Sequence, residues 1–130
     1  MTSAARPLIL IVDDFTDALE MYQEYLTFEG YEIAIARSGH EAFGIAKEKR
    51  PALILMDLRM PGMTGGEALK MLRTDPCLCG VPVVAFTAHA LEDEKQRALL
   101  DGFDEVIAKP CLPNDLRAAI DRLLSDAAHE

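Results

Sequence analysis

Four short apolar runs, each followed at once by polar residues, limit what this chain can fold into more than any other feature. The runs are continuous and mostly β-branched or aliphatic, which is typical of strands that are buried on both faces of a sheet. They cover residues 8–12, 52–56, 81–86 and 106–108. The polar residues that follow them are Asp13 and Asp14, Asp57, Thr87, and Lys109 with Pro110. Parallel strands would bring these groups together at the carboxyl-terminal edge of one sheet, where open α/β folds place their sites.

Helical patterns separate these strands. Apolar residues recur at helical spacing from Ala18 to Leu26, Gly30 suits the end of that helix, and residues 31–36 predict a further strand. Two pairs have the spacing of a capping box and predict helix starts, namely Ser38 with Glu41 and Thr64 with Glu67. A fourth helix is expected from about His89 to Leu100, and a final helix from Pro113.

Helices that join consecutive short strands imply right-handed crossovers and a parallel sheet. We therefore predict one α/β domain over residues 1–130, with its core at about 8–124. Its expected architecture is a (βα)5 flavodoxin-like, doubly wound, five-stranded parallel sheet with strand order 2-1-3-4-5. In that order the first and third strands are neighbours, so Asp13 and Asp14 face Asp57 across a crevice.

The charge balance excludes some classes of partner. A net charge of −9 argues against direct binding to nucleic acid, which depends on basic contacts to phosphate, and against an anionic membrane surface. The amino-terminal residues do not resemble a signal peptide, and no apolar run approaches membrane-spanning length, so we expect a cytoplasmic protein. The cysteines, at positions 77, 79 and 111, are interpreted as thiols in a reducing compartment rather than as a zinc or redox site.

Three carboxylates at one sheet edge repel one another unless a cation joins them. Mg²⁺ prefers oxygen ligands and is often held by one or two carboxylates, with positions left for phosphate oxygens. Lys109 adds a positive charge suited to a phosphoryl group, and Thr87 can donate a hydrogen bond to it. No serine, cysteine or histidine follows a strand in a comparable position, so the predicted nucleophile is a carboxylate.

Each of these residues also has a simpler interpretation. Asp13 and Asp14 could cap the first helix, and Thr87 the fourth. Asp57 could belong to a turn, and Lys109 to a solvated strand end. The metal and phosphoryl interpretation rests on the joint placement of these residues.

Four motifs carry a family resemblance. They are Val-Asp-Asp at 12–14, Leu-Met-Asp-Leu-Arg-Met-Pro-Gly at 55–62, Phe-Thr-Ala at 86–88 and Ala-Lys-Pro at 108–110. In this order and spacing the chain resembles a response-regulator receiver domain of two-component signalling, over about residues 8–124. The resemblance implies a switch that helps to catalyse its own phosphorylation and dephosphorylation and that is not otherwise an enzyme.

The resemblance also implies roles for single residues. Asp57 would accept a phosphoryl group from a histidine of a sensor kinase or a histidine phosphotransfer protein. Asp14, Asp57 and the main-chain carbonyl of Arg59 would bind Mg²⁺, or Mn²⁺ in its place, and Asp13 would act through a coordinated water. Thr87 would turn toward the phosphoryl oxygen. Lys109 would pair first with Asp57 and then with the phosphate, and its bond to Pro110 is expected to be cis.

One position departs from the family pattern. Receivers usually carry an aromatic switch residue three positions before the lysine, and here that residue is Val106. We therefore expect a partial switch, or a switch that uses another surface. The expected output is binding to a downstream effector protein. Two side chains near the site, those of His89 and Arg59, either modulate the phosphoryl group or face solvent. The fourth and fifth helices carry an exposed charged face that could dimerise or be solvated, and we expect it to be solvated; its residues are Glu92, Glu94, Lys95, Arg97 and Arg117.

The alternatives belong to other classes. A degenerate receiver would bind partners without phosphorylation. An aspartate-nucleophile phosphatase would place two acids one residue apart after the first strand and carry a cap insertion, and the chain shows neither. A flavodoxin would need a Ser/Thr/Gly-rich phosphate loop where Asp13 and Asp14 stand.

Overall fold

Strands and helices alternate along the chain as the sequence predicts. The structure is a computed structural model that describes residues 6–14, 16–60, 62–88, 90–109 and 112–128. The elements in chain order are β1 (Leu8–Val12), α1 (Thr16–Phe28), β2 (Glu32–Ala36), α2 (Gly39–Lys49), β3 (Leu53–Met56), α3 (Gly65–Arg73), β4 (Val83–Thr87), α4 (Glu92–Asp101), β5 (Glu105–Ala108) and α5 (Pro113–Ala128). No helix within these ranges is both long and apolar enough to span a membrane.

The five strands form one parallel sheet in the order β2-β1-β3-β4-β5, which confirms the predicted topology. Val12 lies in register with Ala36 on one side and with Met56 on the other. Thr87 lies in register with Ala108. Because these residues sit at strand ends, the residues that follow them emerge at a single edge.

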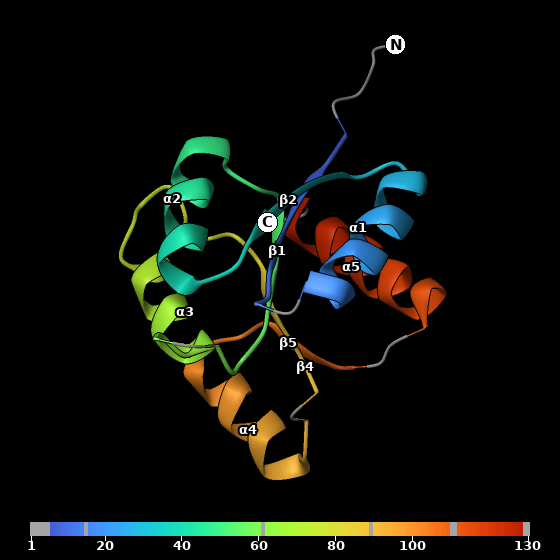
Figure 1. The fold of residues 1–130 in the computed structure, drawn as a ribbon. Coiled ribbons are helices and arrows are strands. Elements are labelled where there is room, and N and C mark those ends of the chain that lie inside the picture. Colours follow the sequence, from blue (N-terminus) through green and yellow to red (C-terminus); the bar gives the residue numbers. More distant parts are fainter. Residues whose placement is uncertain (1–5, 15, 61, 89, 110–111, 129–130) are drawn as a thin grey trace.

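Helices cover both faces of the sheet (Figure 1). The side chains of Ile9 and Ile11 pack with apolar residues of α1 and α5, among them Leu19 and Leu116. On the other face, Leu10 and Val12 pack with residues of α2, α3 and α4. The alternation along β1 follows from the two-residue period of a strand and leaves the sheet buried on both sides, as continuous apolar runs predict.

The element boundaries differ from the sequence expectation by a few residues, for local reasons. The strand β4 begins at Val83 rather than at residue 81, since Pro82 has no N–H for the ladder. The strand β2 begins at Glu32, because the N–H of Tyr31 donates to the carbonyl of Leu26 at the end of α1. The helix α4 begins at Glu92 rather than near His89, because the backbone of Leu91 is extended. The side chain of Leu91 forms no capping hydrogen bond.

The two predicted helix caps are present in different degrees. Thr64 and Glu67 form the full reciprocal capping box at the start of α3. Ser38 accepts a hydrogen bond from the N–H of Glu41, while the Glu41 carboxylate accepts one from the N–H of Arg37 at 3.3 Å. Both helices therefore begin where the side-chain spacing places them.

Gly65, the first residue of α3, lies directly against the backbone that follows β3. Its N–H donates to the carbonyl of Leu58 at 3.0 Å. A Cβ atom at position 65 would lie 2.5 Å from the carbonyl oxygen of Asp57 and 2.9 Å from the Cα of Leu58. The absence of a side chain at Gly65 therefore sets how closely α3 approaches the loop that carries Asp57.

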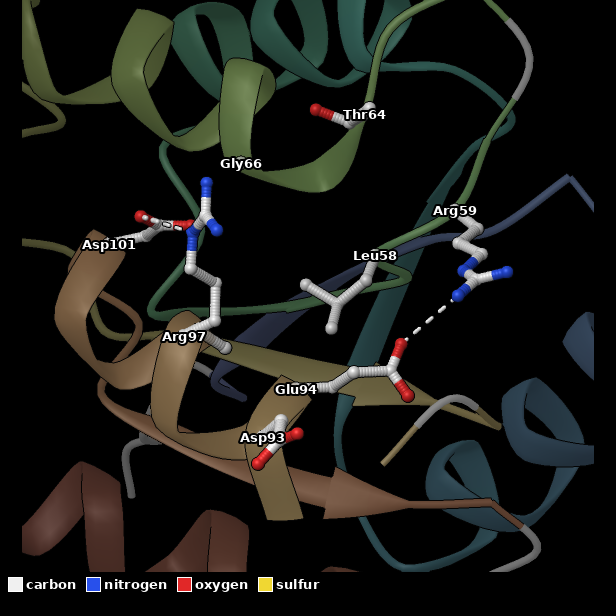
Figure 2. Close-up of a pocket in the computed structure, with 9 residues that line it drawn as sticks. Leu58, Arg59, Thr64, Gly66, Asp93, Glu94, Arg97 and Asp101 are labelled. Atoms are coloured by element: carbon white, nitrogen blue, oxygen red, sulfur yellow. Dashed lines mark hydrogen bonds and ion pairs between the residues drawn. The ribbon is translucent and has the colours of Figure 1, made fainter. Parts of the chain in front are cut away.

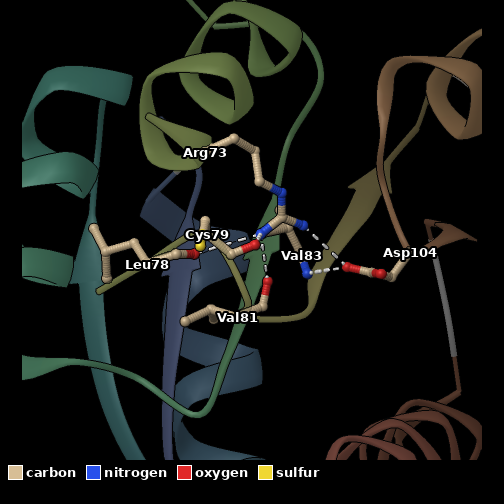
Figure 3. A network of polar contacts seen from close by, with 6 residues as sticks. All are labelled: Arg73, Leu78, Cys79, Val81, Val83 and Asp104. Atoms are coloured by element: carbon tan, nitrogen blue, oxygen red, sulfur yellow. Dashed lines mark hydrogen bonds and ion pairs between the residues drawn. The ribbon is translucent and has the colours of Figure 1, made fainter. Parts of the chain in front are cut away.

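A polar network around Arg73 fixes the opposite edge of the sheet (Figure 3). The guanidinium at the end of α3 donates to the carbonyls of Cys79 at 2.9 Å and Val81 at 2.8 Å, in the segment before β4. It also pairs with Asp104 at 3.3 Å, and Asp104 accepts the N–H of Val83 at 2.8 Å. One side chain thus holds together the end of α3 and the starts of β4 and β5.

Replacing Gly65 by alanine should destabilise the protein by about 1–3 kcal/mol, because the added methyl group meets backbone atoms that cannot move aside cheaply. Gly66→Ala is the matched control: a Cβ there would meet its nearest atom, an oxygen of Asp101, at 3.6 Å. Since alanine favours the helix, that variant should be neutral or more stable by up to about 1 kcal/mol. Urea unfolding of both variants measures the difference, and equal effects would contradict the close approach at Gly65.

Arg73→Met should lower the free energy of unfolding by about 2–3 kcal/mol, because it keeps the aliphatic stem but removes the charged donor shared by several acceptors. Hydrogen exchange should speed up at residues 76–83, the segment that these bonds tie down. Lys70→Met, at an exposed position of the same helix, is the control and should change little. A small loss in Arg73→Met with unchanged exchange would show that the network does not hold this edge.

Candidate functional site

Three carboxylates meet at the carboxyl-terminal edge of the sheet. Asp13 and Asp14 follow β1, Asp57 follows β3, and one oxygen from each lies within 4.8 Å of the others. Backbone bonds beyond the strands fix two of them, since the N–H of Asp13 donates to Ala36 at 3.0 Å and that of Asp57 to Val12 at 2.9 Å. Asp13 is buried, Asp57 half-buried and Asp14 exposed, so the cluster opens to solvent through Asp14.

Lys109 brings a positive charge to this cluster. Its backbone N–H donates to the carbonyl of Thr87 at 2.9 Å, which continues the β4–β5 ladder beyond Ala108. Its ammonium donates to a carboxylate oxygen of Asp13 and lies 3.6 Å from an oxygen of Asp57. It also lies 5.2 Å from the centre of the Phe86 ring, a cation–π distance.

Lys109 thus forms the ion pair with Asp57 that the resemblance implied, and Asp13 is a second, nearer partner. The reason is burial: Asp13 is 3% exposed, and a buried carboxylate is costly unless it is paired and hydrogen-bonded. Asp57 stays within the reach of the same ammonium. Lys109 thus serves two carboxylates at once.

The pKa of Asp57 is raised above its ordinary value, chiefly because burial disfavours the charged carboxylate. Lys109 opposes this pKa shift, as do hydrogen bonds from the N–H of Arg59, at 3.3 Å, and from the side chain of Thr87. The negative charge of Asp13 adds to the increase. The net effect is that the charged form of the Asp57 carboxyl is disfavoured relative to a solvated aspartate.

Thr87 is the last residue of β4 and is fully buried. The hydroxyl that follows the apolar run thus lies inside the site rather than at a solvated helix cap. It reaches the carboxylate of Asp57 from the neighbouring strand.

The side chain of Arg59 pairs with Glu94 on α4 (Figure 2). Its guanidinium lies 3.1 Å from the carboxylate of Glu94, across a pocket of about 450 Å³ between the β3–α3 loop and α4. The sequence analysis expected Glu94 to be solvated, and the structure adds an ion-pair partner that the sequence did not indicate, while 29% of the Glu94 side chain stays exposed. The two residues are 35 positions apart and share no motif, so only the folded chain reveals the contact.

The remaining sequence expectations fall on other parts of the chain. Val106 lies on β5 in register with Ala85 and packs, partly buried, against the core beneath α2, α3 and α4. His89, Pro110 with its expected cis bond, and Cys111 lie outside the described residues. The thiols of Cys77 and Cys79 are free and exposed.

Comparison with known proteins shows the family of this chain. The family model of the response regulator receiver domain matches residues 9–121. The polar-differentiation response regulator DivK of Brucella anthropi is 34% identical over 119 residues, which cover 92% of this chain and 97% of the relative.

Solved structures show the same fold. The CheY-like response regulator receiver domain protein of Methanospirillum hungatei superposes with a TM-score of 0.88 at 31% identity, covering 96% of this chain and 98% of that one. The receiver domain of sensor histidine kinase PA1611 from Pseudomonas aeruginosa has a magnesium ion coordinated in its active site cleft. It superposes with a TM-score of 0.86 at 29% identity, covering 93% of this chain and 99% of that one. The chain therefore belongs to the response-regulator receiver domains of two-component signalling.

Proposed function

We propose that this receiver accepts a phosphoryl group on Asp57 from a phosphohistidine and so switches its binding to a partner protein. The donor would be a sensor histidine kinase or a histidine phosphotransfer protein, as the family implies. The observation that carries the proposal is the joint placement of Asp57 between carboxylates on one side and Thr87 and Lys109 on the other. Receiver domains are signalling modules, and catalysis here would be limited to the chain's own phosphorylation and dephosphorylation.

The donor set suits Mg²⁺. It consists of three carboxylates, from Asp13, Asp14 and Asp57, with one oxygen of each within 4.8 Å of the others, and Mg²⁺ prefers such oxygen ligands. The residues that would hold the ion are Asp14, Asp57 and the main-chain carbonyl of Arg59, with Asp13 acting through a water. Mn²⁺ would fit the same oxygen ligands. When bound, the ion supplies positive charge against the phosphoryl oxygens.

The transfer itself would use the carboxylate of Asp57 as nucleophile. A carboxylate oxygen forms a bond to phosphorus while the bond from phosphorus to the donor imidazole nitrogen breaks, and its electron pair leaves with that nitrogen. The ammonium of Lys109, 3.6 Å from Asp57, would stabilise the charge on the transferring group. The hydroxyl of Thr87 would move its hydrogen bond to a phosphoryl oxygen of the aspartyl phosphate.

A second candidate is a receiver that binds partners without phosphorylation. The observation in its favour is Val106, which supplies no aromatic ring on β5 to report the state of the site. The acceptor experiment separates the two candidates.

Incubation with acetyl phosphate and Mg²⁺ should give a phosphoryl adduct on the wild-type protein, measured as intact mass. The adduct should be absent without Mg²⁺ and in Asp57→Asn, because the nucleophilic oxygen and a metal ligand are both lost. Lys109→Met should lower the yield at least about tenfold, in line with the loss of one electrostatic donor to a transferring group.

Asp101→Asn, at the far end of α4, is the control and should be phosphorylated like the wild type. A folded wild-type protein that binds Mg²⁺ yet forms no adduct would favour the phosphorylation-independent module.

The raised pKa of Asp57 gives the metal-free protein a pH dependence. As the pH rises above about 4, the unfolded chain loses this proton more readily than the folded chain, so the Asp57 contribution to stability falls until the folded carboxyl is also ionised. Asp57→Asn removes this loss and should melt at a higher temperature than the wild type at pH 7 in EDTA. The difference should disappear below about pH 4, and saturating Mg²⁺ should raise the melting temperature of the wild type only. A variant less stable than the wild type at pH 7 in EDTA would contradict the premise that burial of the Asp57 carboxylate costs stability.

A further inference from the structure

We propose that Glu94 holds the Arg59 side chain away from Asp57, and that phosphorylation draws this guanidinium to the phosphoryl group and so releases α4. The inference rests on the proposed function, since it needs a phosphoryl group on Asp57. Arg59 would thereby couple phosphorylation of Asp57 to the position of α4.

Arg59 is the residue that touches both ends of this connection. Its N–H donates to a carboxylate oxygen of Asp57 at 3.3 Å, so its Cα lies within about 5 Å of that oxygen. Its guanidinium lies 3.1 Å from Glu94 on α4 (Figure 2). An arginine side chain is long enough to reach a group on Asp57 from that position.

The Glu94 carboxylate and a phosphoryl group on Asp57 would compete for the guanidinium of Arg59. In the unphosphorylated state the ammonium of Lys109 lies near Asp57 and Asp13, and the guanidinium of Arg59 stays with Glu94. A phosphoryl group adds negative charge and acceptor oxygens beside Arg59. The planar guanidinium matches phosphate oxygens in a two-pronged geometry, which favours transfer to the new anion.

Few residues of α4 are buried against the rest of the protein, so a single ion pair can contribute noticeably to holding this helix in place. Among Glu92–Asp101 only Ala98 is buried, and Leu99 and Leu100 are 52% and 85% exposed. A pocket separates α4 from the β3–α3 loop, and the Arg59–Glu94 pair spans it. The other ion pair at this pocket, between Arg97 and Asp101 at 3.8 Å, lies within α4 and ties it to nothing else.

The proposal predicts reciprocal coupling between the ion pair and the site. Glu94→Gln should tighten binding of beryllofluoride with Mg²⁺, used as the phosphoryl analogue, by about two- to fivefold, the effect that one exposed ion pair supports. The gain should vanish when Arg59 is also replaced by glutamine. Asp93→Asn is the control for charge alone, because Asp93 is exposed on the same helix and has no contact with Arg59 in Figure 2.

Hydrogen exchange of α4 supplies the second measurement. Without ligand, Glu94→Gln and Arg59→Gln should both speed exchange over residues 95–101, whereas Arg97→Gln should not. In the wild type, beryllofluoride with Mg²⁺ should have the same effect on α4. In Arg59→Gln the ligand should add nothing there.

The outcomes separate this inference from the proposed function. If the wild type binds beryllofluoride but Glu94→Gln does not bind it more tightly, the inference is wrong and the proposed function stands. The same conclusion follows if the gain persists in the double variant with Arg59→Gln, or if Asp93→Asn alone gives an equal gain. If the folded wild type binds no beryllofluoride with Mg²⁺, both are wrong.

Discussion

The site depends on one positive charge, the ammonium of Lys109, placed between the buried carboxylate of Asp13 and the half-buried carboxylate of Asp57. Asp13 is almost fully buried at the end of β1, and such a carboxylate is stable only with a partner. Lys109 supplies that partner from β5, two strands beyond β3, because the parallel register brings the ends of β1, β3, β4 and β5 to one edge. The same ammonium lies 3.6 Å from Asp57, so one side chain both balances the buried carboxylate and faces the acceptor. Lys109 thus contributes both to the stability of the fold and to the proposed phosphoryl transfer.

Local patterns in the sequence were enough to predict the strands, the helices between them and the polar residues at the strand ends, while the strand order came from the known order of flavodoxin-like folds. Strand length and continuity gave the buried strands, and the capping-box spacing of Thr64 and Glu67 gave the start of α3. Contacts between distant segments were not predictable, because no local pattern encodes them. Arg59 with Glu94 and Arg73 with Asp104 each join separate elements, and the need for glycine at position 65 appears only when α3 packs on the Asp57 backbone.

The two edges of the sheet are built differently. At the amino-terminal edge, the Arg73 guanidinium satisfies carbonyls before β4 and joins them to Asp104, with 29% of its side chain exposed. At the carboxyl-terminal edge, burial raises the pKa of Asp57. Within the described residues, the β3–α3 loop forms one ion pair with α4, between Arg59 and Glu94, and this pair is exposed. A firmly tied edge fixes where β4 and β5 start, and hence where Thr87 and Lys109 stand. The carboxyl-terminal edge, where the charged form of Asp57 is disfavoured, is the one that a cation or a phosphoryl group would change most.

The energies involved limit how completely such a domain can switch. Moving a two-state equilibrium from nearly all of one state to nearly all of the other takes about 5.5 kcal/mol of differential stabilisation. One charge-assisted hydrogen bond from Thr87 supplies about 1.5–3 kcal/mol, and an exposed ion pair such as Arg59 with Glu94 about 0.2–1 kcal/mol. With Val106 in place of an aromatic residue, these contributions together fall short of a full shift. A partner that prefers one state of α4 would have to supply the rest through its own binding energy, so the phosphoryl group and the partner would act jointly.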